Sequence, residues 1–164
     1  MGGSQATELP ERHAPIFSGT DQHGSTFDVK SMEGRPWIAS FFFTSCSDVC
    51  PALNTVVAQL QKDYGHAVRF VSISTDPETD TVEELKKYAA QYGAKDGVWW
   101  MIRMPFDSMR TVASKGFGLI DPQEPAMHST RFVAIDSHMK ISGYYDSAEP
   151  KDMDNLRSWI NSQL

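Results

Sequence analysis

Two cysteines lie close together in the chain, and their spacing allows specific chemistry. Cys46 and Cys50 are four positions apart, and the 164-residue sequence contains only these 2 Cys. They lie between an apolar run, Trp37 to Phe43, and a segment whose apolar residues recur at helical spacing. On one helical turn, the Cβ atoms of the two cysteines would be about 5–6 Å apart. Both sulfurs could then bind one soft metal ion or, after a small adjustment, form a disulfide.

The surroundings of the pair favour reactive thiols over inert ones. A helix N-terminus lowers the pKa of a nearby thiol, although Asp48 would oppose this effect if it faced the sulfurs. The alternative is a pair of buried, unreactive cysteines, because free cysteine is commonly buried. We favour a functional pair, since it follows a predicted central strand and open α/β sheets bind ligands at the carboxyl ends of their strands. The pair alone leaves both metal binding and redox chemistry open.

Strands and helices alternate along the rest of the chain. The hydrophobic pattern predicts strands over residues 37–43, 68–74 and 98–102, a helix after each of them, a hairpin of strands 131–135 and 140–145, and a helix across 153–160. Thr81 and Glu84 form a capping box that starts the second helix. The alternation predicts an α/β fold, in which a mixed central sheet is flanked by helices and followed by a C-terminal β-hairpin and helix.

The length predicts a single domain, which we place at residues 15–164. Residues 1–14 are polar and are expected to form a flexible segment, whose first four residues resemble a cloning remnant. The sequence has no secretory signal and no run of about 20 apolar residues, so we expect that a natural targeting or anchoring segment has been cut away. The formal net charge is -6, and the absence of a basic cluster argues against a nucleic-acid partner.

Four segments of the sequence resemble the Sco/SenC family. Residues 41–51 resemble its Phe-x-x-Thr-x-Cys-x-x-x-Cys-Pro signature, 74–81 its Asp-Pro-Glu-x-Asp-Thr segment, 128–133 its His-Ser/Thr motif before a strand, and 135–146 its closing hairpin. The resemblance runs from about Pro15 to the end of the chain. It implies a thioredoxin-like fold and a copper site whose ligands are Cys46, Cys50 and His128.

The resemblance also implies a role. Members of the family are tethered copper proteins linked to cytochrome c oxidase assembly. The chain is therefore expected to be a monomeric metallochaperone that delivers copper to an oxidase subunit or another copper protein. Its expected location is outside the bacterial cytoplasm, in the periplasm and tethered to the membrane, or in the mitochondrial intermembrane space.

Ligand chemistry supports copper independently of the resemblance. Thiolates select Cu(I), and an imidazole suits both Cu(I) and Cu(II). Structural zinc normally takes four ligands, which makes zinc a weaker candidate. The alternative function is a thiol–disulfide oxidoreductase that uses Cys46 and Cys50, for example to reduce the cysteines of the copper-receiving protein. The three-residue spacer and His128 favour copper, because a thioredoxin-like enzyme more usually carries Cys-x-x-Cys. A thiol peroxidase is disfavoured, since Thr44 lies two rather than three positions before Cys46.

The remaining candidate residues have simpler interpretations. A solvated surface position is expected for the other histidines, which are His13, His23, His66 and His138. The acidic residues Asp76, Glu78 and Asp80 lack the ligand series of an EF-hand, and we assign them to a strand-end turn and helix capping. Met127 adjoins His128 and is a minor candidate for metal transfer, since methionine more often fills gaps in a core. Trp99 and Trp100 are adjacent on a predicted strand, so their side chains are expected on opposite faces.

Overall fold

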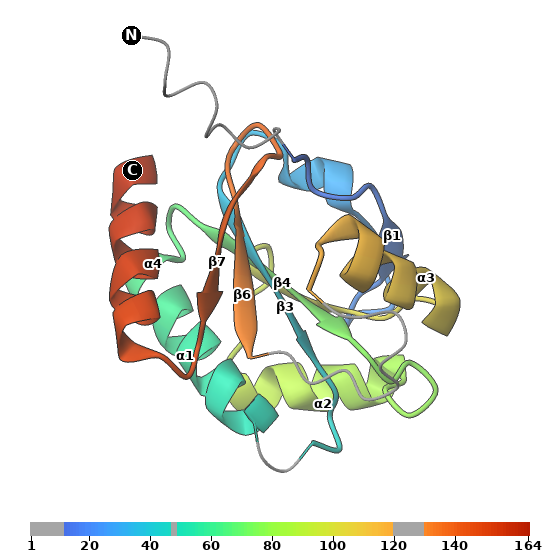
Figure 1. The fold of residues 1–164 in the computed structure, drawn as a ribbon. Helices are drawn as coiled ribbons and strands as arrows, with labels where there is room; N and C mark the ends of the chain where they lie inside the picture. Colours follow the sequence, from blue (N-terminus) through green and yellow to red (C-terminus); the bar gives the residue numbers. More distant parts are fainter. Residues whose placement is uncertain (1–11, 47–48, 120–129) are drawn as a thin grey trace, which may run out of the picture.

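The protein is built around a five-stranded sheet with helices on both faces (Figure 1). The computed structural model describes residues 12–46, 49–119 and 130–164. Within them the strand order is β5–β4–β3–β6–β7, which makes β3 the central strand. A separate two-stranded sheet, β1–β2, lies near the N-terminus. The predicted α/β class, with a mixed sheet between helices, is confirmed.

The elements follow the predicted order, with bounds that shift by a few residues. They are β1 (Ser18–Thr20), β2 (Thr26–Asp28), the 3-10 helix η2 (Val29–Met32), β3 (Trp37–Phe42), α1 (Val49–Tyr64), β4 (Arg69–Ser74), α2 (Val82–Tyr92), β5 (Trp99–Ile102), α3 (Phe106–Thr111), the π-helical turn η3 (Val112–Gly116), β6 (Arg131–Ile135), β7 (Ile141–Asp146) and α4 (Pro150–Gln163). Among the helices described, none is long and apolar enough to cross a membrane.

The pairing of the strands brings their carboxyl ends to one edge of the sheet. β3 is parallel to β4, and β4 is parallel to β5. β6 is antiparallel to β3 and to β7, as expected for a terminal hairpin. The parallel ladder of β3 and β4 ends at the pair Phe42 and Ser74, so the turns that follow these two strands lie beside each other. The cysteine segment follows β3 at this edge.

Two hydrophobic clusters cover the two faces of the sheet, and the alternation of β3 divides its side chains between them. Trp37, Ala39 and Phe41 belong to the first cluster, on the side of α3 and η3. Ile38 and Phe42 belong to the second, which also contains side chains of α1, α2 and α4. β3 is buried at all six positions, which explains why it reads as an almost continuous apolar run. The two adjacent tryptophans of β5 also lie on opposite faces of the sheet, as expected. Trp99 lies in the second cluster, and Trp100 packs against the first.

The ends of the helices reflect capping residues in the local sequence. The Thr81 side chain accepts a hydrogen bond of 3.3 Å from the Glu84 N–H at the start of α2, as the capping box predicts. The helix then ends at Gly93, whose φ of 69° is left-handed. α3 begins at Phe106, directly after Pro105.

Residues 12–14, which precede Pro15, already pack against the rest of the protein. The Ala14 N–H donates to the Met139 carbonyl at 2.7 Å, and the Ile141 N–H donates to the Arg12 carbonyl at 2.8 Å. These bonds join the segment to the turn between β6 and β7. Of the residues expected to be flexible, those that the structure describes are therefore held in place.

Candidate metal centre

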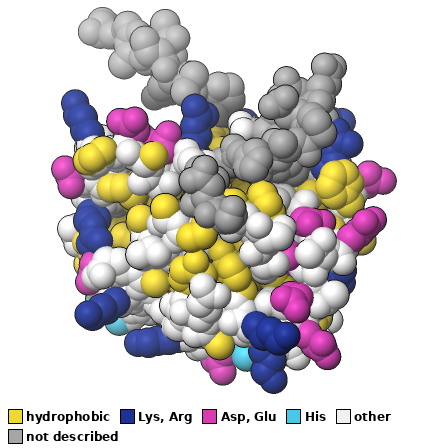
Figure 2. All heavy atoms as spheres, turned by 90° about the horizontal axis from the view of Figure 1, so that it is seen from below, with side chains coloured by type: hydrophobic (Ala, Val, Ile, Leu, Met, Phe, Trp, Pro, Cys, Tyr) yellow, Lys and Arg dark blue, Asp and Glu magenta, His cyan; other side chains and the backbone are white. Residues whose placement is uncertain are grey.

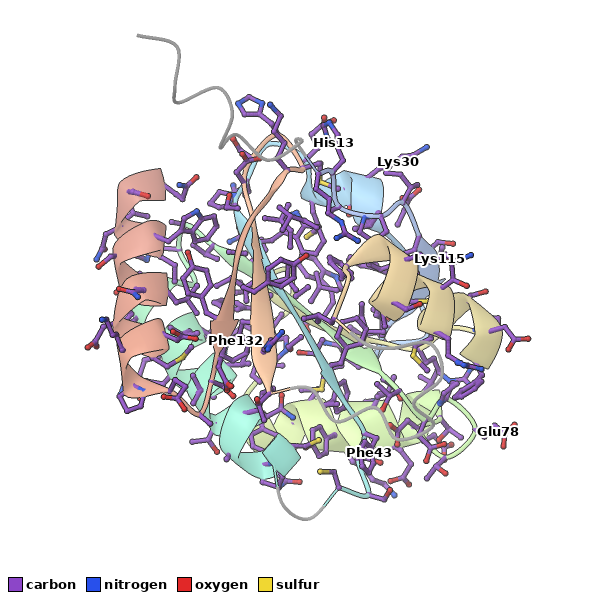
Figure 3. The ribbon with its side chains drawn as sticks, viewed as in Figure 1. His13, Lys30, Phe43, Glu78, Lys115 and Phe132 are labelled. Atoms are coloured by element: carbon purple, nitrogen blue, oxygen red, sulfur yellow. The ribbon has the colours of Figure 1, made fainter. Side chains whose placement is uncertain are left out.

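The two cysteines lie at the junction between β3 and α1. Beyond β3 the chain turns, and the Cys46 N–H donates to the Phe43 carbonyl at 3.1 Å. Cys50 follows in the first turn of α1, and its N–H donates to the Cys46 sulfur at 3.3 Å. Cys46 therefore lies in the turn before α1, and only a segment that was helical throughout would put both cysteines on one helical turn. The fold still brings the pair together, and Phe43 marks this edge of the sheet in Figure 3.

Neither cysteine forms a disulfide, and both are buried, with 9% of Cys46 and 5% of Cys50 exposed. Burial, followed by the hydrogen bond with Cys46, raises the pKa of Cys50 to about 12, and the charges of Cys46 and Asp80 act in the same direction. A backbone hydrogen bond with Phe43 opposes the shift. The expectation that the helix N-terminus would lower the pKa of this thiol is wrong, because loss of hydration in an apolar cluster outweighs the helix dipole. At neutral pH Cys50 is a thiol, and a metal must displace its proton.

The environment of the cysteines is mainly apolar. Both belong to the second cluster, together with Phe42 of β3 and Leu53 and Val57 of α1. Figure 2 views the molecule from this end: hydrophobic side chains gather in the middle of the face, and most charged side chains lie toward its rim. Sulfur donors in apolar surroundings suit a soft metal ion, whereas Mg²⁺ or Ca²⁺ would require several oxygen ligands.

A buried carboxylate lies beside the cysteine turn, and the sequence patterns did not predict this contact. Asp80 is 0% exposed and accepts hydrogen bonds from the Thr44 N–H, the Thr44 hydroxyl and the Ser74 hydroxyl. It had been assigned with Asp76 and Glu78 to a strand-end turn and helix capping. The available signal was that polar residues follow two predicted parallel strands, whose ends must meet at one edge of the sheet.

A second buried polar contact lies one helical turn beyond Cys50. Asn54 is 0% exposed, and its Nδ2 donates to the Tyr88 hydroxyl at 3.0 Å. Tyr88 stacks on Phe42 with ring centroids 5.2 Å apart, and burial raises its pKa. The Asn54 Oδ1 has no hydrogen-bond partner within the described part of the chain. The Tyr88 hydroxyl is therefore the partner that the structure shows for this buried amide.

Replacing Tyr88 by Phe is expected to destabilise the protein by about 1–3 kcal/mol, because the Asn54 amide would lose its acceptor inside the second cluster. Urea unfolding measures the change. Tyr145→Phe is the matched control, since the hydroxyl of Tyr145 makes no hydrogen bond to the residues described. Equal losses in the two variants would contradict the assignment of this contact.

The described residues bring together two of the three predicted metal ligands. His128 lies outside them, as does Met127. In the ranges 12–46, 49–119 and 130–164 there is no group of three or more His, Cys, Asp or Glu side chains that could hold a metal ion. All four other histidines lie at exposed positions, as expected. His13 is at the end of the molecule opposite Phe43 (Figure 3), and His23 forms a hydrogen bond of 2.7 Å between its Nε2 and the Asp96 Oδ1.

Comparison with known proteins identifies one matching family. The family model described as SCO1/SenC matches residues 5–160. A SCO1/SenC family lipoprotein from Bacillus anthracis str. Ames is similar in structure, with a TM-score of 0.81 and 28% identity, and the match covers 93% of this chain and 95% of that one. The match includes the cysteine segment and the predicted histidine motif within one family model.

Two further solved structures of Sco proteins are similar to this chain. BsSco, described as a member of the Sco family of cytochrome c oxidase assembly proteins with a disulfide switch, is 27% identical with a TM-score of 0.79, and the match covers 93% of this chain and 94% of that chain. Arabidopsis thaliana ScoI with copper bound shares the fold with a TM-score of 0.72 at 22% identity, and the match covers 91% of this chain and 98% of that one.

Proposed function

Because the chain belongs to the SCO1/SenC family, we propose that it binds one copper ion through Cys46, Cys50 and His128 and delivers the ion to a cytochrome c oxidase-type copper site. The observation that carries the proposal is the contact of 3.3 Å between the Cys50 N–H and the Cys46 sulfur, which brings together two cysteines that form no disulfide. His128 is the third ligand by its match to the family motif. Copper is the cargo of such a protein, so the site must both bind the ion and release it.

The donor set fits copper better than zinc. Two thiolates and an imidazole suit Cu(I), and the imidazole also suits Cu(II). A structural zinc site usually closes with a fourth protein ligand, whereas three protein ligands leave the metal open to exchange. A receiving protein could approach the open side and replace the three ligands one at a time.

The residues around the pair supply the other requirements of a carrier. The apolar second cluster limits access of water to the sulfurs and suits a soft ion of low charge. Since burial keeps the Cys50 thiol protonated, binding of copper releases a proton from it and transfer returns one. The cysteines must therefore be reduced for the protein to bind copper. Delivery of the copper requires no chemical turnover.

The decisive experiment is an anaerobic titration of the reduced protein with Cu(I) against a competing Cu(I) chelator. We expect one equivalent of Cu(I) to bind tightly enough to be withdrawn from the chelator. A protein that binds no Cu(I) in this competition, while its two thiols titrate as free, would overturn the copper proposal.

His128→Ala is expected to weaken Cu(I) binding by at least about tenfold, or about 1.4 kcal/mol, because it removes one of three ligands. Both thiolates remain, so binding should weaken without being lost. The same titration measures the change. His138→Ala is the matched control, because His138 is exposed in the turn between β6 and β7. If both variants match the wild type, His128 is not a ligand.

The proposal also covers the transfer of copper to a recipient and the location of the protein. The similar Bacillus anthracis protein is a lipoprotein, which supports a domain that works outside the cytoplasm while tethered to a membrane. Mixing the Cu(I)-loaded protein with the soluble copper domain of an oxidase subunit should transfer the metal, and the recipient should develop the absorption of its copper centre. Retention of copper in the presence of excess recipient would count against delivery.

The adjacent thiols also favour a second candidate function, a thiol–disulfide oxidoreductase. Cys46 and Cys50 would form a disulfide and give up two electrons and two protons, which convert a disulfide of the receiving protein into two thiols. The disulfide switch of BsSco, 27% identical to this chain, supports the idea. Incubation of the reduced, copper-free protein with an oxidised recipient domain tests it, and unchanged thiol content in the recipient would rule it out.

A further inference from the structure

We propose that Asp80 is a positioning residue for the copper ligands, because its buried carboxylate holds the turn that carries Cys46. The Thr44 N–H donates to its two oxygens at 3.1 Å and 3.3 Å, and the Thr44 hydroxyl donates to Oδ1. The Ser74 hydroxyl donates to Oδ2 at 2.7 Å. A carboxylate that is 0% exposed is costly unless such bonds satisfy it, so this contact is specific. The inference rests on the proposed copper function.

The backbone of Asp80 is itself held in place by hydrogen bonds to the rest of the protein. The Asp80 N–H donates to the Asp76 carbonyl at 2.9 Å. Arg103 donates through Nε to the Asp80 carbonyl at 3.0 Å and through an Nη to the Pro77 carbonyl at 2.6 Å. The Arg103 backbone in turn exchanges two hydrogen bonds of 2.9 Å with Thr20. These hydrogen bonds fix the position of Asp80, so its side chain can orient the neighbouring turn that contains Thr44.

Thr44 connects the fixed Asp80 to the turn that contains Cys46. The parallel ladder of β3 and β4 ends at Phe42, so Thr44 lies beyond the hydrogen bonds of that ladder. Two residues later, the Cys46 N–H closes the turn on the Phe43 carbonyl at 3.1 Å. The Cys46 sulfur then accepts from the Cys50 N–H. A continuous path of contacts therefore runs from Asp80 through Thr44 to both sulfurs, as partners outside the ligand shell do at many metal sites.

Asp80→Asn is expected to weaken Cu(I) binding by about tenfold, the lower range for loss of such a partner. Thr44→Val removes the hydroxyl donor, leaves the charge of Asp80 in place, and should weaken binding severalfold. Thr44→Ser keeps the donor and should restore wild-type affinity. Because Asp80 and Thr44 act through one contact, the double variant Asp80→Asn/Thr44→Val should be no weaker than Asp80→Asn alone. Glu78→Gln is the matched control, since this exposed carboxylate on the same loop points away from the molecule (Figure 3).

A second measurement needs no copper. Amide hydrogen exchange of the reduced protein reports the hydrogen bond that closes the turn, and the Cys46 N–H should exchange about tenfold faster in Asp80→Asn than in the wild type or Glu78→Gln. This result keeps the inference testable if the wild type binds no Cu(I), an outcome that would defeat the proposed function alone.

Two results would overturn the positioning role. If Asp80 serves only stability, the folded variants will keep wild-type Cu(I) affinity and Cys46 exchange, while their unfolding midpoints fall. If it acts only by its charge, Asp80→Asn will ease thiolate formation and tighten Cu(I) binding, and Thr44→Val will leave binding unchanged. Weaker binding in both variants with rescue by Thr44→Ser is the result that positioning requires.

Discussion

The double variant Cys46→Ser/Cys50→Ser is expected to lose Cu(I) binding by at least about 1,000-fold, or about 4 kcal/mol. A serine hydroxyl stays protonated at neutral pH and is a hard oxygen donor, whereas Cu(I) prefers thiolate. These two sulfurs lie side by side, and the sequence contains no other cysteine that could replace them. The anaerobic chelator competition measures the loss, and each single variant should fall between the wild type and the double variant.

Stability is the necessary control for this result. Cys46 and Cys50 are almost fully buried in the second cluster. A serine hydroxyl there can cost about 1–3 kcal/mol if it finds no partner. Cys46→Ala/Cys50→Ala introduces no hydroxyl and should lose Cu(I) binding equally while it remains folded by circular dichroism. A folded double variant that still binds one Cu(I) with wild-type affinity would place the copper elsewhere in the protein.

Phe117→Ala is expected to reduce the free energy of unfolding by about 3–5 kcal/mol, the usual cost of removing a buried aromatic ring. Phe117 is 0% exposed and meets three rings edge to face, with centroids 6.1 Å from Phe17, 6.3 Å from Trp37 and 5.9 Å from Phe41. It therefore joins the N-terminal segment to the central strand. Guanidinium unfolding at constant pH measures the loss.

Phe106→Ala is the matched control for Phe117→Ala. Phe106 is 42% exposed at the start of α3, so its removal should cost less than about 1 kcal/mol. The two variants also separate stability from binding. Phe117 belongs to the first cluster and the cysteines to the second, so folded Phe117→Ala should keep wild-type Cu(I) affinity. Similar losses of stability in the two variants would contradict the role assigned to Phe117.

Local sequence patterns were sufficient for the order of the main elements and for the choice of Cys46 and Cys50 as candidate ligands. The division of the β3 side chains between the two clusters follows from the period-2 geometry of a strand, and that geometry also sends Trp99 and Trp100 to opposite faces. The start of α2 follows from Thr81 and Glu84, which contact each other across a single turn. Each of these signals acts between residues a few positions apart, so the amino-acid order contains it in full.

These local patterns could not predict properties that depend on burial or on residues far apart in the sequence. The helix N-terminus predicted a lowered pKa for Cys50, but packing in the second cluster raises that pKa to about 12. The helical spacing placed both cysteines on one turn, but the chain beyond β3 puts Cys46 in a separate turn. In both cases a local rule was outweighed by the arrangement of neighbouring elements.

The sequence by itself determined the order of the elements, the alternation of the sheet and the two cysteines that define the site, because each depends on short-range periodicity or residue type. Only the tertiary structure decided that Asp80 bonds to Thr44, since 36 positions separate them and the parallel pairing of β3 with β4 brings their turns together. It also decided the protonation of Cys50, because the cost of a buried charge depends on everything packed around it.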